Sequence, residues 1–128
     1  MAPRRRQSLP CAFYVAGRGC LDAAGHRNMR VHLLLVIIVN LLAAWLQIPL
    51  THWLLLWLCI GLVLSAEMLN TAIELAIDLT CPEEHELARR SKDIAAGAVL
   101  TVSMIALGIG LAIFARPVLQ VVSESIRF

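Results

Sequence analysis

The sequence predicts an all-α membrane protein in which a short amphipathic interfacial helix precedes three transmembrane helices. Of its 128 residues, 59% are hydrophobic and only 16% are charged, and the mean hydropathy is +0.77. Soluble domains have an apolar share of about 45–50%. Three apolar runs, about 31–49, 53–79 and 94–115, are each long enough to cross a bilayer. A chain of this length has room for one domain.

Charge and cysteine content argue against several other classes of protein. The net charge is +2, and no basic stretch is interleaved with aromatic residues, so no nucleic-acid partner is expected. The four cysteines, Cys11, Cys20, Cys59 and Cys81, form no C-x-x-C pair. We interpret them as free thiols, with neither a metal site nor a disulfide framework.

The N-terminal segment is predicted to lie on the membrane surface. Residues 1–10 are basic and expected to be disordered, although Pro10 suits the first turn of a helix. Over residues 11–24 apolar side chains recur at about helical spacing, whereas Arg18 and Asp22 share another side. This pattern is typical of an interfacial helix. The two charges also argue against a signal peptide, so the segment is expected to remain in the mature protein.

Helix-breaking and polar residues mark the ends of the spans. Gln47 and Pro49 are expected to end the first span, and a very short turn is expected at residues 51–52. A polar loop is expected over residues 80–93, and Pro117 is expected to end the third helix.

The distribution of basic residues predicts the orientation. Six arginines precede the first span, and Arg89, Arg90 and Lys92 lie in the second predicted loop, whereas the first turn has no basic residue. Basic residues are enriched on the cytoplasmic side. The N-terminus and the second loop are therefore expected to be cytoplasmic.

A polar stripe near the end of the second apolar run is the most informative feature for function. Glu67, Asn70, Glu74 and Asp78 are spaced by three, four and four residues, so on a helix they lie within about 80° of one another. The alternative interpretation is a solvated helix end, which fits Asp78 well. Glu67 lies deeper, and carboxylates inside a membrane are costly and usually functional. The stripe therefore favours a buried site that binds cations or handles protons.

The carboxylates of the stripe suit different tasks. Glu74 is placed to meet Mg²⁺ and phosphate near the interface, and Glu67 is placed to accept a proton. Asn70 can orient either carboxylate, and Lys92 is the candidate cation for phosphates, although its surroundings equally fit an ordinary positive-inside loop. The sequence has no glycine-rich phosphate loop, so a phosphotransferase here is not of the P-loop or protein-kinase type.

Two segments resemble the small bacterial integral-membrane lipid kinases, the diacylglycerol and undecaprenol kinases. The segment Glu67–Glu74 reads E-M-L-N-T-A-I-E and matches the pattern E-x-[IL]-N-[ST]-A-I-E, and residues 84–100 include the pair Lys92-Asp93. The resemblance covers about residues 13–115. It implies phosphorylation of a membrane lipid hydroxyl by ATP with Mg²⁺, a homotrimer, and a multi-pass protein of the bacterial inner membrane.

The resemblance also implies roles for single residues. Glu67 would be the general base for the lipid hydroxyl, Asn70 would support it, and Glu74 would hold Mg²⁺. The implied ATP-binding residues are Glu74, Glu83, Glu84, His85, Lys92 and Asp93. The implied lipid-binding residues are Asn28, Arg30, Glu67 and Ala96.

One position departs from the family pattern. A second Mg²⁺ carboxylate usually precedes the first span, in a segment like E-R-N-x-[RK]-x-H, whereas this chain has His26 at that position. Histidine is a poorer Mg²⁺ ligand than a carboxylate. Three consequences are open: water fills the position, Asp22 reaches it, or the activity is weak.

The lipid acceptor is the least determined part of the prediction. The R-N-x-R-x-H form and the I-A-A-G-A-V-L run resemble the undecaprenol kinase branch more, so conversion of undecaprenol to its monophosphate is favoured. The alternatives are conversion of diacylglycerol to phosphatidic acid, and a non-catalytic membrane subunit that has lost activity. The membrane domain is expected over residues 11–115, with a C-terminal tail over 116–128.

Overall fold

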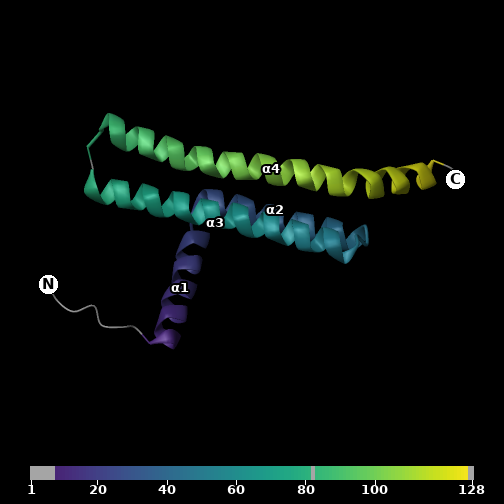
Figure 1. Ribbon diagram of the computed structural model, residues 1–128, viewed down its shortest axis with the longest axis horizontal. Coiled ribbons are helices and arrows are strands. Elements are labelled where there is room, and N and C mark those ends of the chain that lie inside the picture. The colour runs from purple at the N-terminus through teal and green to yellow at the C-terminus, as the bar shows by residue number, and fades with distance from the viewer. Residues whose placement is uncertain (1–7, 82, 127–128) are drawn as a thin grey trace.

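The computed structural model describes residues 8–81 and 83–126 and forms four α-helices over them (Figure 1). They are α1 (Leu9–Ala24), α2 (Arg27–Trp45), α3 (Leu50–Thr80) and α4 (Glu86–Ser125). No strand occurs in this part of the chain. By length and composition, α2, α3 and α4 can each cross a membrane. The predicted all-α membrane fold with three spans is confirmed.

Helix α1 projects sideways from the three long helices (Figure 1). Pro10 lies in its first turn, as predicted, and Ala23 at its other end is the only one of its residues that is buried. Phe13 and Leu21 are about three-quarters exposed. A helix that runs across the spans and exposes large apolar side chains is suited to the membrane interface. Of the segment 1–10 expected to be disordered, residues 1–7 lie outside the described part.

The connection between α2 and α3 lies earlier in the chain than predicted. Helix α2 ends at Trp45, and Gln47 has a φ of 49°, in the left-handed region. Pro49 caps α3, which begins at Leu50, so the prediction of a turn at residues 51–52 was wrong. The physical reason is that proline has a fixed φ and no N–H, which suits it to begin a helix rather than only to end one.

Two contacts hold α2 against α3 at the end where they connect. Ala43, Ile48, Leu56 and Ile113 form a buried cluster that also includes α4. About one turn before Ala43, the indole of Trp57 on α3 donates a hydrogen bond to Asn40 Oδ1 on α2 at 3.2 Å. The Asn40 amide in turn donates to the Val36 carbonyl within α2 at 2.7 Å. These contacts position α2 beside α3 and leave the other end of the pair for the polar stripe.

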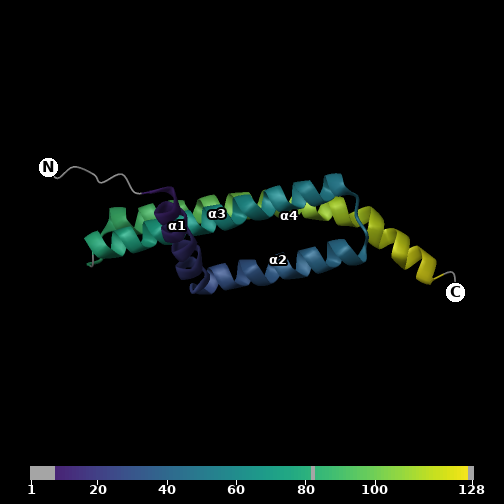
Figure 2. The same cartoon turned by 90° about the horizontal axis from the view of Figure 1, so that it is seen from below.

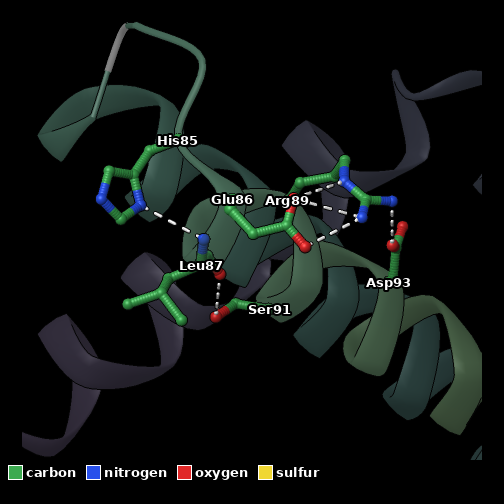
Figure 3. Close-up of polar contacts among 6 residues, drawn as sticks. All are labelled: His85, Glu86, Leu87, Arg89, Ser91 and Asp93. Carbon is green, nitrogen blue, oxygen red and sulfur yellow. Dashed lines mark hydrogen bonds and ion pairs between the residues drawn. The ribbon is translucent and has the colours of Figure 1, made fainter.

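Helix α4 begins earlier than predicted. His85 Nδ1 accepts a hydrogen bond from the Leu87 amide at 3.2 Å, which caps the helix. The Arg89 guanidinium then pairs with Glu86 at 3.1 Å and with Asp93 at 3.3 Å (Figure 3). Pairs three and four residues apart stabilise a helix. The prediction of a loop as far as residue 93 was therefore wrong, because its charges are arranged to support a helix.

Helix α4 also continues beyond the predicted stop. Pro117 lies inside it, and the helix ends at Ser125, so the expectation that Pro117 ends the helix was wrong. Proline removes one hydrogen bond and kinks a helix without always ending it. Figure 2 shows the yellow end of α4 turning away from α3.

Candidate active site

The polar stripe on α3 is buried over half of its length. Glu67 is 3% exposed and Asn70 is 4% exposed, whereas Glu74 is half-buried and Asp78 is exposed. A solvated helix end would leave all four residues accessible. The stripe is therefore a buried polar site at Glu67 and Asn70 that opens towards Asp78.

A polar cavity of about 170 Å³ lies between the start of α2 and this part of α3. Its lining residues are all polar or charged: His26, Arg27, Asn28, Glu67, Thr71 and Glu74. His26 occupies the N-cap position of α2 without a capping hydrogen bond from its side chain, so the cavity lies where α2 begins. The structure thereby brings four predicted site residues to one cavity: Glu67, Glu74, His26 and Asn28.

Asn70 is bonded to Glu74. Its Nδ2 donates a hydrogen bond to Glu74 Oε1 at 2.9 Å, while its Oδ1 is buried without a partner among the described residues. The resemblance implied that Asn70 supports Glu67. In this structure its amide instead orients the carboxylate that is the predicted metal ligand.

An apolar groove of about 320 Å³ runs along α2, α3 and α4. Val36, Val63 and Leu107 are typical of its lining, and His32 is one of its few polar residues. The His32 Nε2 atom lies 3.9 Å from Glu67 Oε2. The apolar groove and the polar cavity therefore meet at the His32–Glu67 contact.

The remaining predicted ATP-binding residues lie around the α3–α4 connection. Glu83, Glu84 and His85 are exposed in the linker between the two helices. Lys92 pairs with Asp78, one turn of α3 beyond Glu74. Asp93 pairs with Arg89 (Figure 3). These residues are near the exposed end of the stripe, but none of them lines the polar cavity.

The predicted lipid-binding residues are separated. Asn28 lines the polar cavity beside Glu67. Arg30 on α2 and Ala96 on α4 are exposed and line neither the cavity nor the groove.

Comparison with known proteins identifies the family. The family model described as prokaryotic diacylglycerol kinase matches residues 14–114. The chain belongs to the prokaryotic diacylglycerol kinase family. It is 38% identical to the undecaprenol kinase of Bacillus subtilis over 104 residues, which are 80% of this chain and 85% of the relative.

Other relatives are named diacylglycerol kinases. The chain is 37% identical over 115 residues to the diacylglycerol kinase of Synechocystis, covering 88% of this chain and 66% of the relative. It is 35% identical over 86 residues to the diacylglycerol kinase of Escherichia coli, covering 67% of this chain and 68% of the relative. The family is one of membrane lipid kinases and thus uses ATP.

Three residues of the site were missed by sequence reasoning. Arg27 and Thr71 line the polar cavity, and His32 contacts Glu67. The signal was present, because Thr71 lies four residues after Glu67 and His32 lies four after Asn28, so each shares a helix face with a predicted residue.

A metal ion in the polar cavity would need ligands in addition to the described side chains. Within the described ranges, no three His, Cys, Asp or Glu residues are placed to hold an ion by themselves. Mg²⁺ usually keeps several waters and binds one or two carboxylates together with substrate phosphates. Glu74, which is hydrogen-bonded to Asn70, would offer such a carboxylate, and His26, which lines the same cavity, would be a weaker ligand.

Proposed function

We propose that this chain transfers the γ-phosphoryl group of ATP to the hydroxyl of a membrane lipid, with Glu67 as the general base. The observation that carries the proposal is the position of Glu67. It is a buried carboxylate in a polar cavity, and it faces the end of an apolar groove at His32. A lipid alcohol needs such a junction, because its chain is apolar and its reacting group is polar.

The reaction needs one proton acceptor. The lipid oxygen forms a bond to the γ-phosphorus, its proton moves to a Glu67 carboxylate oxygen, and the bond to the bridging oxygen of ADP breaks. Mg²⁺ would neutralise charge on the phosphate oxygens. Glu74 would hold that ion, with Asn70 fixing the carboxylate and His26 beside it.

We place the nucleotide at the exposed end of the stripe. Glu83, Glu84 and His85 lie in the linker that follows α3, and Lys92 and Asp93 lie in the first turns of α4. The Lys92 ammonium group is paired with the exposed carboxylate of Asp78. A phosphate of the nucleotide would replace that carboxylate as its partner. Such an exchange is inexpensive because exposed ion pairs contribute about 0–1 kcal/mol.

Undecaprenol is the proposed acceptor, and diacylglycerol is the alternative. This chain aligns with 85% of the length of the undecaprenol kinase of Bacillus subtilis at 38% identity. Its motif before the first span has the form R-N-x-R-x-H. Asn28 at the cavity, with Arg30 and Ala96 outside it, would contact the lipid head region.

We also propose an orientation and an assembly. The N-terminus and the α3–α4 linker would face the cytoplasm of the bacterial inner membrane, because basic residues gather there. A homotrimer would form through α4. A Cβ at Gly97 or Gly108 would meet nothing within 4 Å in the single chain, so another helix can approach α4 closely at these positions.

The proposal is tested with the purified protein in detergent micelles, Mg·ATP, and either undecaprenol, diacylglycerol or no lipid. We expect ADP formation that depends on a lipid alcohol and is faster with undecaprenol. Faster turnover of diacylglycerol would overturn the choice of acceptor alone. No turnover would overturn the kinase proposal in favour of a non-catalytic subunit. ATP turnover at the same rate with either lipid and without lipid would overturn transfer to a lipid hydroxyl.

A further inference from the structure

We propose that His32 is a positioning residue for Glu67: its imidazole donates a hydrogen bond from Nε2 to Glu67 Oε2 and holds the carboxylate for the lipid hydroxyl. This inference rests on the proposed function of Glu67 as the general base. It adds a residue from a second helix, α2, to the acid–base machinery of α3.

The Glu67 carboxylate needs a partner. It is 3% exposed, and among the side-chain hydrogen bonds of the described residues none reaches it. A buried carboxylate without a hydrogen bond or an opposite charge is strongly destabilised. His32 Nε2, at 3.9 Å from Glu67 Oε2, is the one basic nitrogen within ion-pair distance in the described ranges.

The distance from His32 Nε2 to Glu67 Oε2 is longer than a hydrogen bond, but a small side-chain movement would form the bond. An N–H···O⁻ bond measures about 2.7–2.9 Å, so closure needs a movement of about 1 Å. Catalytic hydrogen bonds are often long before the substrates bind. The His32 side chain is 20% exposed and therefore has room to move.

His32 and Glu67 lie on the two sides of the junction between the apolar groove and the polar cavity. His32 lines the apolar groove, whereas Glu67 lines the polar cavity. A lipid chain in the groove would pass the imidazole before its hydroxyl reached the carboxylate. A bond from His32 to one carboxylate oxygen leaves the other oxygen for that hydroxyl. The other basic groups of the cavity, His26 and Arg27, lie on its wall at the start of α2.

The first test measures kcat and the KM for Mg·ATP of two His32 variants in the micelle assay. His32→Leu removes the donor, and His32→Gln keeps an N–H donor at a similar reach. We expect His32→Leu to lower kcat about tenfold or more, with little change in KM for ATP, because a hydrogen bond to a charged group is lost. His32→Gln should recover most of the loss.

A double variant separates positioning from independent action. If His32 acts through Glu67, adding His32→Leu to Glu67→Gln should leave kcat at the value of Glu67→Gln alone. Multiplication of the two effects would overturn the proposal. Asn40→Leu is the matched control, because it removes another polar contact between α2 and α3 away from Glu67. We expect it to lower thermal stability but not kcat.

A spectroscopic readout does not depend on activity or on a foldable His32 variant. With ¹⁵N-labelled histidine, the Nε2 signal of His32 should shift when Glu67→Gln is introduced, while that of His85 in the α3–α4 linker should not. An unmoved His32 signal would overturn the pairing. If the wild type turned over no lipid, the proposed function would fail, and this measurement would still decide whether His32 and Glu67 are bonded.

Discussion

Asn70 donates its hydrogen bond to Glu74, one turn further along α3, and not to Glu67. The two acidic residues of the cavity therefore have different supports. Glu74 is held by an amide of its own helix, and Glu67 faces His32 of α2. This division suits one carboxylate that holds a cation and another that exchanges a proton.

Asn70→Ala should weaken the metal site. Glu74 would lose a hydrogen bond to its charged carboxylate, which is typically worth about 1.5–3 kcal/mol. We expect the Mg²⁺ concentration for half-maximal turnover to rise about tenfold. If Asn70→Ala instead lowered kcat at an unchanged Mg²⁺ requirement, the amide would be supporting Glu67.

Glu74→Ala should have a larger effect of the same kind. Glu74 is the carboxylate that we assign to Mg²⁺, so the variant should need more Mg²⁺ than Asn70→Ala while its KM for the lipid changes little. Glu86→Ala, which removes an exposed glutamate of α4, is the matched control. A Mg²⁺ titration that overlays the wild-type curve would show that Glu74 is not a ligand.

His26→Glu tests the departure from the family pattern. His26 is at the N-cap position of α2 and lines the cavity with Glu74. A carboxylate there adds an oxygen ligand and suits the positive end of the α2 dipole. We expect a lower Mg²⁺ requirement or a higher kcat.

The same variant can also fail in an informative way. If the imidazole has become part of the site, His26→Glu should instead turn over more slowly than wild type across the whole Mg²⁺ range. An unchanged Mg²⁺ titration and an unchanged kcat would place residue 26 outside the site.

The orientation can be tested at Cys81, which lies in the α3–α4 linker and is partly accessible. In a variant with Cys11 and Cys20 replaced by Ala, and with Cys59 buried, a membrane-impermeant thiol reagent should label Cys81 only from the cytoplasmic side. Adding Thr51→Cys at the start of α3 supplies the opposite control. Labelling of Cys81 in intact cells would reverse the orientation.

Much of the fold was predictable from sequence because long apolar runs have few alternatives to membrane helices. The ends of the helices were less predictable. Pro49 begins α3, and Pro117 lies within α4, since proline is compatible with either role. Charged residues after α3 were assigned to a loop, but Arg89 joins Glu86 and Asp93 in a helix.

The candidate site was predictable where its residues share one helix face. The spacing of the α3 stripe placed Glu67 and Glu74 correctly on one cavity. The partner of Asn70 was open, because a residue between two carboxylates can reach either. The role of His32 depends on how α2 packs against α3, which no local pattern specifies.

The most direct test of the account is transfer of labelled γ-phosphate from ATP to the lipid by Glu67→Gln. The substitution keeps the size of the side chain and removes the proton acceptor, and loss of a general base typically costs about 10²–10⁴ in rate. Glu86→Gln, the same change at an exposed glutamate of α4, is the control. The account predicts a loss of this size with ATP binding retained, and lipid phosphorylation within twofold of wild type would contradict it.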